Sequence, residues 1–356
     1  MTPRERILTA LKREEPDRVP MEFSLCPSQM ERFRKETGAS SPAEYFGFGI
    51  RGVGIKRTKL KNDFSKYTAD FPEGARVDEW GIGWISTSTS YHFEHILHPL
   101  QNATTLDEIM EYPFPDVHAA YRYEGLGERV SQLKEAGFAV TASAMAVGGS
   151  VFWPPYKLRS MEQLLVDFMI NQDIADALLD AVTERMAVMA GRLAEASVDI
   201  LRLADDLGTQ LGPMISLDLF RKFIKPRLAM IIESARSVKP EILIFFHSDG
   251  HIQEFIPDLI EIGLDVLNPI QPECMDPAEI KKKYGDKLAF WGTIGTQTTM
   301  PFGTKEEVRQ VVKERIETVG KGGGLLIAPT HLVEPEVPWE NIMALVEAVE
   351  EFGYYK

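Results

Sequence analysis

ILIFFHSDG, residues 242–250, is the stretch that decides the fold, because five apolar residues stop abruptly at a polar turn. The same pattern recurs downstream, where the apolar runs at 266–267, 288–291 and 325–328 end on NPIQ, GT and PTH. A short continuous apolar run is typical of a strand that is buried on both faces of a parallel sheet. These runs therefore predict parallel strands with polar side chains gathered at their carboxyl ends.

Further strands of this kind are expected upstream, and helices separate them. The apolar segments are Val19–Phe23, Ile50–Ile55, Ala139–Ala144 and Ile200–Ala204, and helices are expected at about 3–12, 124–136, 173–195, 217–237 and 339–352. Alternating strands and helices require parallel, right-handed crossovers. Eight strands favour a closed (β/α)8 barrel, a TIM barrel, in which the chemistry occurs at the carboxyl ends of the strands.

Residues 56–115 do not follow this alternation of strands and helices. VDEWGIGWI at 77–85, followed by alternating Ser and Thr up to Phe93, predicts antiparallel strands inserted into the barrel. His92, His95 and His98 repeat at a spacing of three, but on a strand His95 would face away from the other two. A surface or lid role is therefore favoured for them, and residues 1–356 are expected to form a single domain.

Composition limits the classes of function. The chain has 356 residues, 44% of them apolar, and a formal net charge of -14, which argues against nucleic acid as the main partner. Two cysteines, Cys26 and Cys274, predict no disulfide framework and favour a reducing cytoplasm. No signal-peptide core and no stretch of about 18 apolar residues occurs, so we expect a cytoplasmic protein without a membrane segment.

Polar residues at two strand ends are candidates for metal binding. His247 ends the run at 242–246, Asp249 lies on the same turn, and His331 follows the last strand. Imidazole and carboxylate groups together are suitable ligands for Zn²⁺. Alternatively, Ser248 or Asp249 caps the next helix, expected from about residue 252, and both roles are compatible.

Acidic residues at other strand ends are candidates for proton transfer. Asp205 and Asp206 follow the strand at 200–204, and adjacent carboxylates in a closed site raise one another's pKa. Glu22 projects from the end of the first strand, where it could act as a base or as a further ligand. The alternative for the aspartate pair is that one of them caps the following turn.

Substrate contacts are expected from four further residues. Asn268 and Gln271 lie at the end of the strand at 266–267, and Met145 lies beside the flexible Gly148-Gly149 loop. Trp80 belongs to the inserted segment, where it could form a wall of the substrate pocket. Packing is an equally good explanation for the aromatic and Met residues.

Several motifs together resemble the uroporphyrinogen decarboxylase superfamily nearly end to end. They are RERIL…PDRVP at 4–20, HSDG at 247–250, DLIEIGLDVLN at 258–268, FWGTIG at 290–295 and VPWEN at 337–341. The resemblance implies a distorted (β/α)8 barrel. True uroporphyrinogen decarboxylases carry an early RQAGRY-like motif whose arginines clamp substrate carboxylates, but PMEFSLCPS at 20–28 contains no arginine.

The cobamide-dependent methyltransferase branch of the superfamily resembles this chain better. Its coenzyme M methylating members bind zinc through His-x-Cys and a later cysteine, and here His247, Asp249 and approximately His331 stand at those positions. Two histidines and a carboxylate form a harder site than thiolates, suited to polarising oxygen.

The resemblance thus implies transfer of a methyl group from a small O-methyl substrate to the cobalt of a corrinoid on a separate protein. Zinc would polarise the leaving oxygen, and Asp205 or Glu22 would protonate it or hold a ligand in place. Resembling enzymes are often homodimers.

Two other functions remain open from the sequence. One is a carboxy-lyase, a decarboxylase acting on a smaller carboxylic acid, with His331 and Asp205 as its acid and base. The other is a barrel that only binds a corrinoid or tetrapyrrole.

Overall fold

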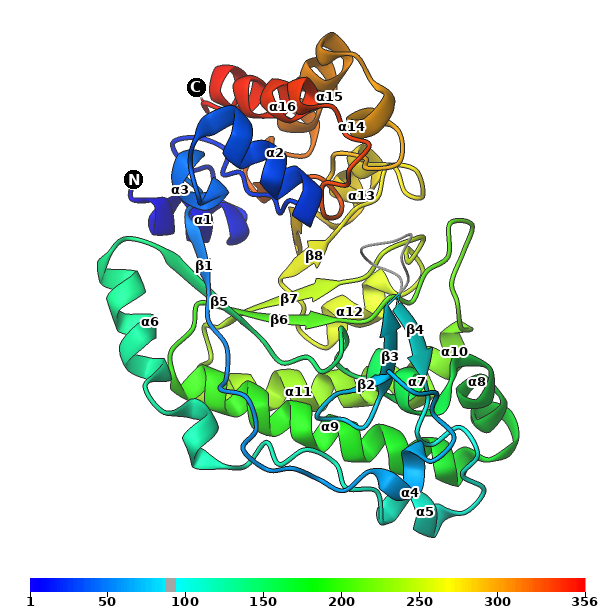
Figure 1. Ribbon diagram of the computed structural model, residues 1–356. Coiled ribbons are helices and arrows are strands. Elements are labelled where there is room, and N and C mark those ends of the chain that lie inside the picture. Colours follow the sequence, from blue (N-terminus) through cyan, green and yellow to red (C-terminus); the bar gives the residue numbers. More distant parts are fainter. Residues whose placement is uncertain (87–93, 356) are drawn as a thin grey trace.

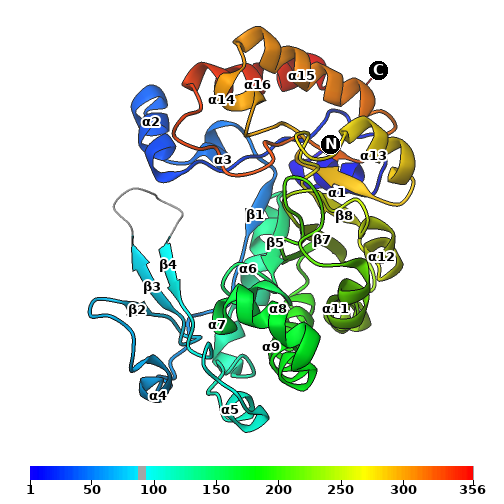
Figure 2. The same ribbon diagram turned by 90° about the vertical axis from the view of Figure 1, so that its right-hand side faces the viewer.

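A curled parallel sheet forms the centre of the molecule (Figures 1 and 2). The computed structural model describes residues 1–86 and 94–355. The sheet has seven strands in the order β1-β5-β6-β7-β8-β9-β10, and every neighbouring pair is parallel. The strands are β1 Ile50–Gly52, β5 Ala139–Ser143, β6 Ile200–Ala204, β7 Leu243–His247, β8 Val266–Asn268, β9 Ala289–Trp291 and β10 Leu325–Leu326. The predicted distorted α/β barrel is confirmed.

Helices connect these strands and cover the outside of the sheet, with α9 and α11 side by side below it and α15 and α16 above it in Figure 1. The helices are α1 Pro3–Leu11, α2 Pro27–Thr37, α3 Pro42–Tyr45, α6 Leu126–Glu135, α7 Trp153–Arg159, α8 Met161–Ile170, α9 Gln172–Glu195, α10 Leu217–Leu219, α11 Lys225–Val238, α12 Ile256–Glu261, α13 Pro277–Tyr284, α14 Thr299–Phe302, α15 Lys305–Thr318 and α16 Trp339–Phe352. The expected helix at 217–237 is interrupted by a π-helical turn, Phe220–Ile224. No described helix is long and apolar enough to cross a membrane.

The apolar runs are continuous because both faces of each strand are buried. Alternate residues, such as Ile200, Leu243 and Phe245, pack together inside the barrel, while Leu201 and Ile244 pack outward against the helices. Helix α1 begins with a capping box at Thr2 and inserts Ile7 and Leu11 into the inner cluster. It plugs the amino-terminal end of the barrel, so the space for a ligand is at the opposite end.

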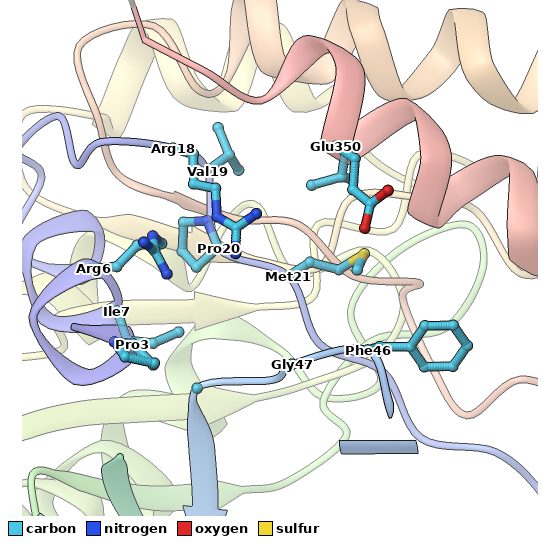
Figure 3. Close-up of a pocket in the computed structure, with 12 residues that line it drawn as sticks. Pro3, Arg6, Ile7, Arg18, Val19, Pro20, Met21, Phe46, Gly47 and Glu350 are labelled. Atoms are coloured by element: carbon cyan, nitrogen blue, oxygen red, sulfur yellow. The ribbon is translucent and has the colours of Figure 1, made fainter. Parts of the chain in front are cut away.

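The strand predicted at 19–23 is wrong. Met21 makes a single parallel bridge with Ile327, so this segment follows β10 without becoming a regular strand. Pro20 has no N–H to donate to a ladder, and the N–H of Val19 bonds to the carbonyl of Gly353 instead. A cavity of about 70 Å³ lies between residues 18–21 and Phe46–Gly47 (Figure 3). Among the described residues the sheet is therefore a seven-stranded open curl, a distorted form of the barrel and not the closed eight-stranded form expected from the sequence.

The inserted segment forms a separate antiparallel sheet beside the barrel (Figure 2). Its elements are α4 Ser65–Thr68, β2 Arg76–Val77, β3 Gly83–Ser86, β4 Glu94–Leu97 and α5 Leu106–Met110. The prediction of an antiparallel insertion near 56–115 is thus confirmed for the described part; its portion at 87–93, with His92, lies outside the described residues.

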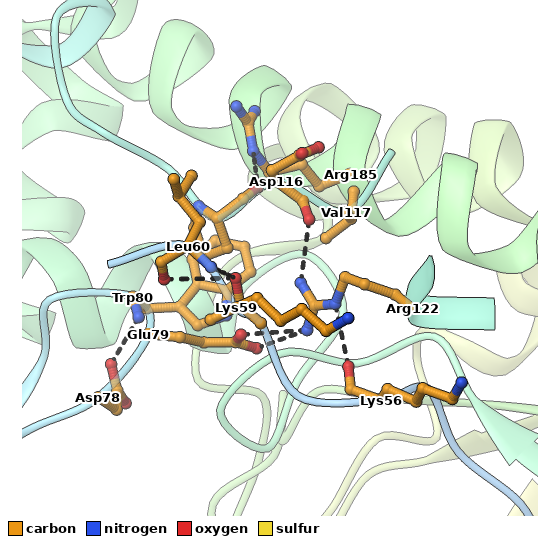
Figure 4. Close-up of polar contacts among 12 residues, drawn as sticks. Lys56, Lys59, Leu60, Asp78, Glu79, Trp80, Asp116, Val117, Arg122 and Arg185 are labelled. Atoms are coloured by element: carbon orange, nitrogen blue, oxygen red, sulfur yellow. Dashed lines mark hydrogen bonds and ion pairs between the residues drawn. The ribbon is translucent and has the colours of Figure 1, made fainter. Parts of the chain in front are cut away.

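Arg122 links the two ends of this insertion to its central part (Figure 4). Its guanidinium is 2% exposed and donates to both carboxylate oxygens of Glu79 at 3.0 Å. It also donates to the carbonyls of Lys56 and Asp116, at 3.1 and 3.2 Å. A buried charge needs such a full set of partners, and here the partners come from three segments.

Candidate functional site

A cavity of about 340 Å³ opens at the carboxyl ends of the barrel strands. Its lining includes Glu22, Phe23, Met145, Arg202, Ala204, Phe245, His247, Asn268, Trp291 and His331. On β6 and β7 the lining residues alternate with residues that pack outward, as expected for strands of a barrel. The cavity is where ligands of (β/α)8 barrels bind.

A hydrogen-bond chain orients His247 at the end of β7. The Asn268 side-chain amide donates to the carbonyl of Trp291 at 2.5 Å, which leaves its Oδ1 facing His247. His247 Nδ1 lies 2.6 Å from that Oδ1 and donates its hydrogen to it. The other ring nitrogen, Nε2, is therefore free to accept a proton or bind a metal ion.

Two carboxylates face His247 Nε2. Asp206 Oδ1 lies 3.6 Å and Asp249 Oδ2 3.8 Å from this nitrogen. The ligand atoms of the three residues all lie within 4.8 Å of one another. Two ligands of a tetrahedral zinc ion are separated by about 3.4 Å when each is about 2.1 Å from the metal. The residues thus fit a zinc ion in both chemistry and spacing.

Close packing of two loops brings the carboxylates together. The N–H of Asp249 donates to Asp206 Oδ1 at 3.0 Å. Gly250 has φ of +82°, and a Cβ on it would lie 2.6 Å from the carbonyl carbon of Gly208, so only glycine fits this contact. The expected capping role of Ser248 or Asp249 is wrong, since the next helix, α12, begins only at Ile256.

The electrostatics of this group favour a bound cation. Burial raises the pKa of Asp249, and the neighbouring Asp206 raises it further. His247 and His331 act in the opposite direction on the Asp249 pKa. Two carboxylates held this close to one another repel, and a metal ion would remove that repulsion.

His331 lies beside this group at the mouth of the cavity. Its ring centre is 6.3 Å from that of His247, so residues 84 positions apart in the chain are neighbours. His331 is exposed and does not belong to the compact group of ligand atoms. Among the described residues, Asp206 takes the position in that group that was expected for His331.

Asp205 is placed differently from what its sequence position suggested. Its carboxylate is completely buried and accepts four backbone hydrogen bonds, from residues 150–153, at 2.8–3.3 Å. Burial raises its pKa to about 7, and the four N–H groups oppose that rise. A Cβ on Gly149 would lie 2.6 Å from its Oδ1. Asp205 anchors the start of α7 and is not part of the cavity lining.

Strand parity explains why Asp206, and not Asp205, faces His247, and why Arg202 also belongs to the site although it was not predicted from the sequence. Ala204 faces into the barrel, so Asp205 points outward and Asp206 returns to the inner side. Arg202 lies two residues before Ala204 and also faces the cavity. The sequence signal for Arg202 is that a charged residue interrupts the otherwise apolar run ILRLA at 200–204.

The remaining expected residues divide between this cavity and its surroundings. Glu22, Asn268 and Met145 line the cavity. Gln271 is 4% exposed and accepts from the N–H of Gly250 at 3.1 Å, so it supports the loop that carries Asp249. Trp80 lines a second cavity of about 390 Å³, which adjoins the first at Met145.

Comparison with known families gives a match over most of the chain. A family model described as Uroporphyrinogen decarboxylase (URO-D) matches residues 100–352. A solved structure described as a methyltransferase from Methanosarcina mazei superimposes with a TM-score of 0.66 and covers 99% of both chains. At 20% sequence identity this likeness supports the fold alone.

Curated relatives include two kinds of protein. The chain is 29% identical over 180 residues to a methylcobamide:CoM methyltransferase, MtaA, of Methanosarcina barkeri, covering 51% of this chain and 50% of that protein. It is 24% identical over 260 residues to a uroporphyrinogen decarboxylase of Pseudomonas fluorescens, covering 70% of this chain and 69% of that protein. The match thus spans about half the length of the first relative.

Asp205 and Asp206 are expected to make different contributions to the free energy of unfolding. Asp205→Ala leaves the N–H groups of residues 151–153 without an acceptor, while the N–H of Ser150 keeps its bond to the carbonyl of Ala204. The substitution should lower the free energy of unfolding by about 2–4 kcal/mol. Asp206→Ala removes one hydrogen bond from a half-buried residue and should cost less than about 1 kcal/mol. Urea unfolding of both variants measures the difference. Equal losses would contradict the assignment of Asp205 as the anchor.

The raised pKa of Asp205 predicts a pH-dependent stability. Because its folded pKa of about 7 exceeds the unfolded value of about 3.9, the folded state binds more protons between these limits. The difference in unfolding free energy between wild type and Asp205→Ala should therefore fall as pH rises from 5 to 7, by at most about 1.4 kcal/mol per unit. A difference that grows with pH would mean that the four N–H groups lower the pKa of Asp205 by more than burial raises it.

Proposed function

This chain belongs to the uroporphyrinogen decarboxylase family, and we propose that within it the protein is a zinc-dependent methyltransferase. It moves a methyl group from a small O-methyl substrate to the cobalt of a corrinoid carried by a separate protein. The relationship to the Methanosarcina methylcobamide:CoM methyltransferase supports methyl transfer as the class of reaction. We assign the activity to residues 1–356 acting as a single domain.

One observation carries the proposal: the free Nε2 of His247 faces two carboxylates at the strand ends of the barrel. Nitrogen and oxygen ligands suit a zinc ion that polarises oxygen, whereas thiolates suit sulfur chemistry. Cys274 donates from its Sγ to Gln210 at 3.4 Å and is not one of the grouped ligands. When bound, zinc would supply Lewis acidity to the departing oxygen.

We assign metal binding, orientation of the imidazole ring and proton donation to side chains of this chain. Asp206, His247 and Asp249 hold the ion, and Asn268 fixes the His247 ring. His331 lines the cavity beside them and donates a proton to the leaving oxygen. In the overall step the methyl C–O bond would break with its electron pair left on oxygen, and the electron pair of the new Co–C bond would come from a Co(I) corrinoid on the partner protein.

A decarboxylase acting on a smaller carboxylic acid is the second candidate. Arg202 and Glu22 line the same cavity, and an arginine could hold a substrate carboxylate there. Release of CO2 in the absence of a corrinoid would decide for this reaction. The same experiment with a corrinoid present, yielding methylcobalt and no CO2, would decide for methyl transfer.

Metal analysis of protein purified without chelators tests the main proposal. Wild type should carry zinc, and His247→Ala and Asp206→Ala should bind it at least about tenfold more weakly, since each removes a direct ligand. His331→Ala should keep the metal but lose methyl transfer from a methoxy acid to free cob(I)alamin. His118→Ala, which changes an exposed histidine outside the lining of the cavity, is the control. A wild-type protein that is metal-free and indifferent to chelators would overturn the proposal.

A further inference from the structure

Arg202 is a cation on the wall of the cavity, inside an otherwise apolar strand. It lies on β6 between Ile200, which packs in the inner cluster, and Ala204, which lines the cavity. Its guanidinium carbon lies 4.8 Å from the ring centre of Phe245 and 5.9 Å from that of Trp291. Two aromatic faces thus hold the guanidinium against the cavity.

Arg202 is half-buried and, unlike the buried arginines Arg159 and Arg227, it has no hydrogen-bonded carboxylate partner. Arg159 donates to Asp167 at 2.7 Å, and Arg227 donates to Asp180 at 2.7 Å. For Arg202, the buried Nε has no hydrogen-bond partner. Among the described residues, no carboxylate oxygen lies within 4.0 Å of its nitrogens.

Removing a cation from water without giving it a partner costs free energy, so the presence of Arg202 at this position requires an explanation. Burial lowers the pKa of Arg202, which expresses this cost. Glu22 is the carboxylate that acts on it electrostatically, but beyond ion-pair distance. Burial also raises the pKa of Glu22, which favours a protonated Glu22 that can donate a hydrogen bond to a neighbouring anion.

We propose that Arg202 binds a carboxylate of the substrate, so that the methyl donor is a small O-methylated organic acid. This inference rests on the methyl-transfer function proposed above and names its substrate class. A planar guanidinium matches a carboxylate through two parallel N–H···O bonds. Phe245 and Trp291 supply apolar walls for the body of the substrate.

The depth of Arg202 in the barrel, below His247, is consistent with a carboxylate-binding role. Arg202 is in register with Phe245, and Ala204 is in register with His247. The backbone of Arg202 therefore lies two residues, about 6.6 Å, below that of the metal-binding histidine. A substrate held by its carboxylate at Arg202 would direct its other end towards His247, Asp206 and Asp249.

The test uses benzoate and its neutral analogue benzamide as probes, with binding measured by calorimetry on the full chain. Wild type should bind benzoate at least about tenfold more tightly than benzamide, since a charge-assisted hydrogen bond is about twice as strong as a neutral one. Arg202→Met should lose this preference, and Arg202→Lys should retain part of it because lysine offers a point charge. Arg51→Met is the matched control, because Arg51 contacts carbonyls and Phe138 outside the cavity.

Stability provides an independent readout. Replacing a half-buried cation whose Nε has no partner with an apolar side chain should leave the free energy of unfolding unchanged or raise it. A marked loss of stability in Arg202→Met, or unaltered benzoate binding in that variant, would overturn the carboxylate site. Equal affinity of wild type for benzoate and benzamide would overturn it as well.

The two proposals can fail separately. Probe binding requires neither a metal ion nor a corrinoid, so a metal-free protein that still selects benzoate through Arg202 would refute methyl transfer and support the anion site. A zinc protein that demethylates 4-methoxybenzamide as well as 4-methoxybenzoate would refute the anion site and support methyl transfer.

Discussion

The site depends on one hydrogen bond, from His247 Nδ1 to Asn268 Oδ1 at 2.6 Å. It links the end of β7 to the end of β8, and Asn268 in turn donates to the carbonyl of Trp291 on β9. Three adjacent strands therefore fix one imidazole ring and its protonation pattern. Because Nδ1 carries the hydrogen, Nε2 is directed to the carboxylates, and the rest of the candidate chemistry follows from that orientation.

The loops after the strands complete the site by means of very close backbone packing. Gly208 and Gly250 allow the loop that carries Asp206 to touch the loop that carries Asp249. The neighbouring Asp205 secures the opposite side of β6 by accepting hydrogen bonds from the backbone at the start of α7. The two adjacent aspartates thus have different roles: Asp205 anchors the fold, and Asp206 faces His247.

Much of the fold was predictable because the apolar runs are long enough to identify strands buried on both faces. The positions of His247 and Asn268 followed from the same argument, since strand ends meet at one rim of a barrel. The strand at 19–23 was mispredicted because apolarity outweighed the missing N–H of Pro20. Asp205 was preferred to Asp206 because the sequence shows adjacent carboxylates but not which of them faces inward. The places of Gln271 and Trp80 depend on loop and insertion packing, which no local pattern encodes.

X-ray absorption and anomalous diffraction at the zinc edge, on the zinc-loaded protein, test the central claim most directly. We expect a single ion at about 2.0–2.2 Å from His247 Nε2 and from one oxygen each of Asp206 and Asp249, with Nδ1 still bonded to Asn268. An ion bound through His247 Nδ1, or held by other residues of the chain, would contradict it.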